Sequence, residues 1–135
     1  MLSTRGTPRE VYEKEAQRKL SKVQEVWPED HGTKHDGGKL PWHLLPPDVI
    51  EEVLKVLDFG AKKYAPRNWE KGMAWSRPFS ALMRHMWAWW RGEDRDAETG
   101  LSHLAHAACC IIFLLGYELR KIGKDDRPHK EPKDD

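Results

Sequence analysis

Carboxylates and imidazoles able to bind a divalent metal ion are concentrated between residues 93 and 106. Hard ions such as Mg²⁺ and Mn²⁺ prefer oxygen ligands, and in triphosphate hydrolysis such an ion neutralises charge and activates water. The residue types therefore fit a metal-dependent hydrolytic site. The members of the cluster are Glu93, Asp94, Asp96, Glu98, His103 and His106.

A purely structural interpretation of this cluster stays open. Acidic runs are commonly solvated turns, and a histidine on an apolar helix is commonly hydrogen-bonded to the backbone. Two features favour function: Glu98 immediately precedes the apolar residues 101–117, and His103 and His106 project about one turn apart from that segment. His85 lies among tryptophans and methionines that resemble core or interface residues, and it is assigned at most a supporting role.

Basic and aromatic residues lie before the predicted helix of residues 47–64, at its end and in the segment after it. Lysines bind phosphate oxygens, an aromatic face stacks on a base, and an asparagine amide pairs with a base edge or a sugar. We therefore expect a nucleotide to bind here, although each tryptophan is equally well explained as a loop anchor on the core. The candidate residues are Lys39, Trp42, Lys63, Tyr64, Asn68 and Trp69.

Several enzyme classes are excluded by their missing motifs. The sequence contains no G-x-x-x-x-G-K-[ST] loop, no paired C-x-x-C zinc ligands and no G-x-S-x-G elbow. Its one His-Asp dipeptide, His35-Asp36, lies in a glycine-rich loop, which argues against a histidine-aspartate phosphohydrolase.

Helices are the elements that must position these residues. Thr7 and Glu10 predict a capping box for a helix that ends before Pro28, and residues 31–47 carry too many glycines and prolines for regular structure. A second helix is predicted from Pro47 to about Tyr64. Its expected core face comprises Ile50, Val53, Leu54, Leu57 and Ala61.

Two further helices complete an all-α fold, because the sequence offers no strand pair. One is predicted from its cap at Ser76 to Gly92, and the other over 101–117, with Asp96 as its N-cap and Gly123 at its close. The last helix is apolar on nearly every side, so we expect it at the centre of the domain or in a subunit interface. The expected core stripe of the earlier helix comprises Phe79, Leu82, Met86 and Trp89.

Composition limits the partners and the compartment. The formal charge of +1 gives no support for stable nucleic-acid binding, and the longest apolar stretch is too short to cross a membrane. The adjacent Cys109 and Cys110 suit reduced, buried thiols, so we expect a cytoplasmic protein. We divide the chain into an N-terminal helical arm (1–30), a catalytic helical domain (31–122) and a disordered charged tail (123–135).

Residues 36–117 resemble the phage-type dATP/dGTP diphosphohydrolase domain, a MazG-like group. The resemblance covers over half of the chain and is specific as a combination of short segments. These segments are DGGK (36–39), LLP (44–46), FGAKKY (59–64), RNWEKG (67–72), SALMRH (80–85), WWRGED (89–94) and ETGLSHLAHAAC (98–109).

The resemblance implies an all-α bundle of about four helices that assembles as a dimer or tetramer. It also implies dependence on Mg²⁺ or Mn²⁺, and attack of water on the α-phosphorus of a purine deoxynucleoside triphosphate, releasing pyrophosphate. Such an activity would adjust a dNTP pool during phage replication. The chain departs from the MazG-like E-x-x-E metal motif, because Glu52 is followed at that spacing by Lys55.

We place the metal between the second and fourth helices, with Glu52, Asp96 and Glu98 as its ligands. Glu98 and His103 are the expected catalytic residues, His103 to position or deprotonate the water or to orient a carboxylate. The phosphates are expected to contact Lys39 and Lys63.

Two other classes remain alternatives. One is a non-catalytic helical protein, either an oligomeric nucleotide sensor or an accessory factor of DNA replication. The other is an enzyme that removes the whole triphosphate and leaves the nucleoside.

Overall fold

The computed structural model describes residues 6–24 and 32–128, and it divides the chain into units 1–40 and 41–135. The division falls ten residues after the expected boundary at residue 30. In the first unit, α1 (Pro8–Gln24) begins with the predicted capping box: Glu10 N donates to Thr7 Oγ1, and Thr7 N donates to Glu10 Oε2. The predicted end of this helix at Pro28 lies outside the described residues.

The second unit is helical, and the described residues contain no strand, only two isolated bridges. This confirms the all-α prediction. The predicted loops before and after the second helix each contain one turn of 3₁₀ helix. The elements are η1 (Trp42–Leu44), α2 (Pro47–Lys63), η2 (Asn68–Lys71), α3 (Ser76–Trp90) and α4 (His103–Arg120).

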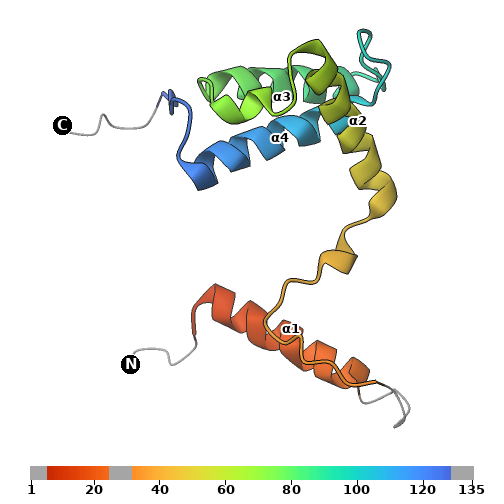
Figure 1. The fold of residues 1–135 in the computed structure, drawn as a ribbon, viewed down its shortest axis with the longest axis vertical. Coiled ribbons are helices and arrows are strands. Elements are labelled where there is room, and N and C mark those ends of the chain that lie inside the picture. Colours follow the sequence, from red (N-terminus) through yellow and green to blue (C-terminus); the bar gives the residue numbers. More distant parts are fainter. Residues whose placement is uncertain (1–5, 25–31, 129–135) are drawn as a thin grey trace, which may run out of the picture. The chain divides into compact units, whose positions relative to one another are not determined.

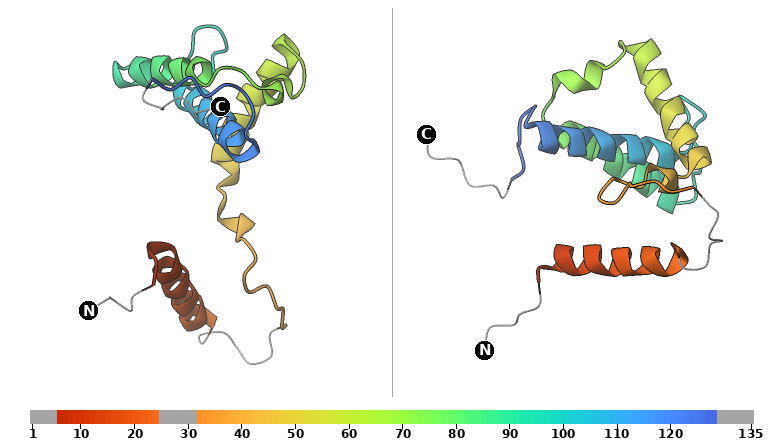
Figure 2. Two further views of the ribbon diagram at one scale, coloured as in Figure 1. Left: turned by 90° about the vertical axis from the view of Figure 1, so that its left-hand side faces the viewer. Right: turned by 60° about the horizontal axis from the view of Figure 1, so that its bottom comes forward.

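Helices α3 and α4 lie side by side as an antiparallel pair, and α2 packs across α4 (Figures 1 and 2). The side chain of Trp75, before α3, donates to the carbonyl of Ile122, after α4, while His85 near the other end of α3 meets His103. The buried cluster between α2 and α4 consists of Val53, Val56, Ala105 and Cys109.

The predicted core of α2 is correct for Val53 and wrong for Leu54, which is 52% exposed. Val56 is buried instead. The reason is that, within the second unit, α2 packs chiefly on α4, so only a narrow strip of its surface is covered. Both cysteines are free and buried, as predicted, and burial raises the pKa of Cys109 to about 12.

The connection between α3 and α4 corrects the predicted cap. The N-cap of α4 is Ser102, whose hydroxyl accepts from Leu104 N, and the helix starts at His103. Asp96 instead closes a separate turn, in which its carboxylate accepts from the backbone N–H of Thr99 and its carbonyl accepts from Gly100 N. The acidic connector is therefore a folded loop.

Residues 124–128 fold back on the start of α3, where the sequence predicted a disordered tail; the rest of that tail lies outside the described residues. Lys124 exchanges backbone hydrogen bonds with Met73 and Trp75. The carboxylate of Asp126 accepts from the backbone N–H of Ser76, so it is Asp126 that caps α3 and not the hydroxyl of Ser76. Among the described helices, none has both the length and the hydrophobicity that spanning a bilayer requires.

Candidate active site

A cleft of about 850 Å³ opens between α2, α3, α4 and the connection that precedes α4. Lys63, Tyr64, Asn68 and Trp69, four of the six expected substrate-binding residues, contribute to its wall. The same wall contains chemistry-bearing residues from the other elements: His85, Asp96, Glu98, Thr99 and His106.

Three histidines meet where α3 crosses the start of α4. Nδ1 of His85 lies 2.9 Å from Nδ1 of His103, and the rings of His85 and His106 stack with their centroids 4.5 Å apart and their planes 8° apart. His103 is buried, with 4% of its surface exposed. His85, assigned a supporting role from the sequence, lies at the centre of the group.

Asp96 joins this group through the hydroxyl of Thr99. Thr99 donates to Asp96 Oδ2 from both its backbone N–H (3.0 Å) and its hydroxyl (3.1 Å), and Thr99 Oγ1 lies 2.7 Å from Nε2 of His106. Burial acts to raise the pKa of Asp96, but the Thr99 hydrogen bonds and the nearby His106 outweigh it and bring the pKa below its usual value. Asp96 is therefore a carboxylate at neutral pH.

The pKa values of His85 and His106 are both lowered, chiefly by burial and, to a smaller extent, by their histidine neighbours. Asp96 opposes this effect at both rings. Both imidazoles are therefore neutral at pH 7, the state in which a ring nitrogen binds a metal ion or accepts a proton.

One group of side chains in the described part of the chain has the spacing of a metal site. Ligand atoms of His85, Asp96 and His103 all lie within 4.8 Å of one another. The other ring nitrogen of His103, Nε2, lies 3.2 Å from Glu93 Oε2 but makes no hydrogen bond of acceptable angle. Two imidazoles and a carboxylate are a donor set that fits a divalent ion.

The expected metal ligands are not brought together as one group. Asp96 belongs to the triad just described, whereas Glu98 lies on the cleft wall and forms an ion pair with Lys63 at 2.7 Å. Glu52 forms an ion pair with Lys55 at 2.6 Å and does not contribute to the cleft wall. The hydrogen bond to Glu98 raises the pKa of Lys63.

Some of the expected nucleotide-binding residues are free to contact a ligand in the cleft, and others are not. Tyr64 and Asn68 line the cleft, but Trp69 acts as an anchor: its ring stacks on Phe113 at 4.7 Å, and its carbonyl accepts from the hydroxyl of Tyr117. Trp42 in η1 is 74% exposed and does not contribute to the cleft wall. Lys39 belongs to the first unit.

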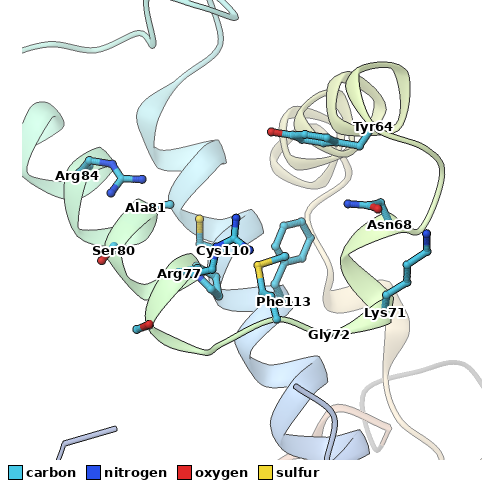
Figure 3. A pocket seen from close by; sticks show the side chains of 13 residues that line it. Tyr64, Asn68, Lys71, Gly72, Arg77, Ser80, Ala81, Arg84, Cys110 and Phe113 are labelled. Carbon is cyan, nitrogen blue, oxygen red and sulfur yellow. The ribbon is translucent and has the colours of Figure 1, made fainter. Parts of the chain in front are cut away.

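A second hollow of about 710 Å³ shares Tyr64, Asn68 and Arg84 with the cleft (Figure 3). Lys71 and Arg77 also line it, and none of its three cationic side chains forms an ion pair within the described part of the chain. The hollow is therefore electropositive and suited to an anion.

Sequence reasoning missed the cationic pair Arg77 and Arg84 and underestimated His85. A partial signal for His85 is present, since consecutive helices commonly fold back on each other as antiparallel neighbours. This places the last turns of residues 76–90 against the first turns of the helix that carries His103. No comparable signal identified the arginines, because cationic residues on a helix surface are usually solvated.

Comparison with known proteins gives one family. A family model described as dATP/dGTP diphosphohydrolase, N-terminal, matches residues 29–127, which include every residue of the triad. The chain is 40% identical over 96 residues to a protein of Salmonella phage PMBT28 named dATP/dGTP diphosphohydrolase. The match covers 71% of this chain but 33% of that protein's length. No solved structure matches the chain.

Proposed function

The chain belongs to the dATP/dGTP diphosphohydrolase N-terminal family, and from this premise we propose that it hydrolyses dATP or dGTP to the monophosphate and pyrophosphate. The observation that supports this most directly is the cleft, which combines Asp96 and neutral imidazoles with an adjoining electropositive hollow. The name of the phage relative agrees with it. We place the activity in the host cytoplasm, where it would adjust a phage dNTP pool.

In the proposed reaction, the oxygen of a water molecule forms a bond to the α-phosphorus. The bond from the α-phosphorus to the bridging oxygen breaks, and pyrophosphate leaves with that oxygen and its electron pair. A divalent ion, Mg²⁺ or Mn²⁺, would neutralise charge on the phosphates and polarise the water.

The proton released by the water needs a basic atom on the cleft wall. The sequence suggested His103, but His106 lines the cleft and His103 does not. The Thr99 hydroxyl proton is best used in the charge-assisted bond to Asp96, so Nε2 of His106 donates to Thr99. This assigns the lone pair, and hence proton acceptance, to Nδ1 of His106.

We assign the β- and γ-phosphates to the electropositive hollow. Arg84 borders both the cleft and the hollow, so a triphosphate whose α-phosphorus lies in the cleft can extend toward Arg77 and Lys71. Guanidinium groups bind phosphate oxygens in pairs, which suits a leaving pyrophosphate. Lys63, which lies on α2 and is held by Glu98, would also contact the phosphates. We assign the base and the sugar to Tyr64 and Asn68.

Chromatography of products from the four dNTPs, each with and without Mg²⁺ or Mn²⁺, tests the proposal. Metal-dependent release of dAMP or dGMP with pyrophosphate is expected, and an Asp96→Asn variant should lose it. Formation of the deoxynucleoside and tripolyphosphate would instead identify an enzyme that removes the whole triphosphate. Nucleotide binding without turnover, measured by calorimetry, would identify a sensor, and salt-sensitive DNA binding that ignores nucleotide would identify an accessory factor.

A further inference from the structure

The two facing ring nitrogens of His85 and His103 have the spacing of neighbouring ligands on one ion. Their Nδ1 atoms are 2.9 Å apart. Ligands at roughly 2.1 Å from a metal and at right angles to each other are separated by about 3.0 Å. Without an ion, one of these nitrogens must carry a proton to avoid repulsion between lone pairs. With an ion, both lone pairs have the same partner.

A carboxylate oxygen of Asp96 lies within 4.8 Å of ligand atoms of both histidines. Both donors of Thr99, and the closest approach of His106, involve Oδ2. Oδ1 accepts no hydrogen bond from a described residue. The turn that holds the carboxylate is thus fixed through one oxygen, which leaves the other available as a ligand.

The remaining nitrogen of His103 supports the same assignment. Nε2 is buried, has no hydrogen-bond partner within the described residues, and lies 3.2 Å from Glu93 Oε2. A metal-binding histidine usually donates its second N–H to a carboxylate, which fixes the tautomer and strengthens the ligand nitrogen. A small rotation of the exposed Glu93 side chain would complete such a bond and leave Nδ1 free for the ion.

We propose that His85, Asp96 and His103 form a two-histidine, one-carboxylate site that binds Mn²⁺ and heavier first-row divalent ions in preference to Mg²⁺, with Glu93 as a positioning residue. Imidazole nitrogens suit first-row transition ions, whereas Mg²⁺ strongly prefers oxygen ligands. The ion's catalytic role rests on the proposed function, but its binding does not.

Titration of the metal-free full chain with Co²⁺ and with Mg²⁺ tests the site. We expect visible absorption bands of nitrogen-coordinated Co²⁺ and an affinity for Co²⁺ or Mn²⁺ at least about 10-fold above that for Mg²⁺. His85→Ala and Asp96→Asn should each weaken Co²⁺ binding by more than about 100-fold, because each removes a ligand. His43→Ala, which removes an exposed histidine of η1, is the matched control and should bind as the parent does. Equal affinity for Mg²⁺ and Co²⁺, or unchanged binding by His85→Ala, would overturn the proposal.

Glu93→Gln tests the positioning role separately. We expect the shape of the Co²⁺ spectrum to be kept, because the ligands are unchanged, and the affinity to fall about 10-fold. The thermal midpoint of the metal-free protein should not change. A lower midpoint would show that Glu93 stabilises the fold and would contradict its role in positioning His103.

Failure of this proposal is distinguishable from failure of the proposed function. A Co²⁺ site that depends on His85, in a protein that hydrolyses no dNTP, would keep the site and end the enzymatic assignment. Hydrolysis that runs equally well with Mg²⁺ and survives His85→Ala would keep the enzyme and end the site.

Discussion

The hydroxyl of Thr99 links two titratable side chains, because it donates to Asp96 and lies 2.7 Å from Nε2 of His106. It therefore fixes both the orientation of the carboxylate and the tautomer of the imidazole. Thr99→Val keeps the shape and removes these bonds. Loss of such a supporting contact should lower metal affinity and kcat by about 10- to 100-fold. Thr99→Ser keeps the hydroxyl and should stay close to the parent in both measurements; equal losses in the two variants would contradict the assigned role.

Arg84 is the cationic residue that borders both the cleft and the electropositive hollow, so its removal should weaken substrate binding. Arg84→Ala should raise KM for the preferred dNTP by about 10-fold or more, since a charge-assisted hydrogen bond to phosphate is lost. Steady-state kinetics measure this. Arg91→Ala, which removes an exposed arginine just after α3, is the matched control and should leave KM unchanged. If the Arg84→Ala enzyme kept the parental KM, the phosphates would not bind in this hollow.

At the scale of elements, the segment after α4 is held against the start of α3 by close backbone contact. A Cβ on Gly123 would collide with the carbonyl oxygen of Met73, and its φ of 76° is one that side chains rarely adopt. Gly92 also has a positive φ, of 99°, but open space around it. Gly123→Ala should therefore lower the free energy of unfolding by about 2 to 3 kcal/mol, and Gly92→Ala by about 1 kcal/mol. Urea denaturation measures both, and equal losses would show that the contact with Met73 contributes nothing.

Glu70 joins η2 to α4, because its carboxylate accepts from Arg120 at 2.6 Å and from Arg67. These hydrogen bonds lower its pKa, Arg120 contributing most. The folded state therefore prefers the charged form, so this stabilisation is complete above the ordinary pKa of 4.5 and is lost as pH falls through the folded value. Glu70→Gln should flatten the decline of the thermal midpoint between pH 5 and pH 3, measured with EDTA present. The exposed Glu51→Gln is the control and should keep the parental slope.

The helices could be predicted from the sequence because their signals are local. The capping box of Thr7 and Glu10, the proline at residue 47 and the glycine at residue 92 act within one turn of the residues that they order. The site could be predicted only in part. Asp96 was recognised as chemically important but assigned to the wrong element, since its hydrogen bonds to Thr99 compete with helix capping and Ser102 lies closer to the apolar run.

The contacts that complete the site join distant segments, and the local pattern indicates at most that two consecutive helices fold back on each other, not which residues then meet. His85 meets His103 across 18 residues of chain, and Lys63 meets Glu98 across 35. Predicting such pairs requires the angle and register at which α2 and α3 pack on α4, which depend on which small residues allow close approach. Ala105 and Cys109 supply that approach here, and their residue types carry no functional signal in the sequence.

At the scale of the whole molecule, the predicted core stripe of α3 is largely uncovered within the second unit. Phe79 is 52% exposed, and Met86 and Trp89 are each 36% exposed, so for these residues a core position within this unit is wrong. Ile111 and Leu115, one turn apart on α4, are also half exposed. Exposed apolar side chains that gather on the faces of packed helices commonly form interfaces. This supports the expected homo-oligomer.

Sedimentation equilibrium of the full chain tests the oligomer. We expect a mass at least twice that of one chain, because burial of these side chains against a second copy stabilises the assembly by about 25 cal/mol per Å² of apolar surface. The double variant Ile111→Glu with Leu115→Glu should dissociate to monomers, since it would bury two unpaired charges. Lys121→Glu, at the exposed C-cap of α4, changes the net charge by the same amount and should stay associated. Monomers in the parent protein, or equal dissociation in both variants, would show that this face of α4 is not the interface.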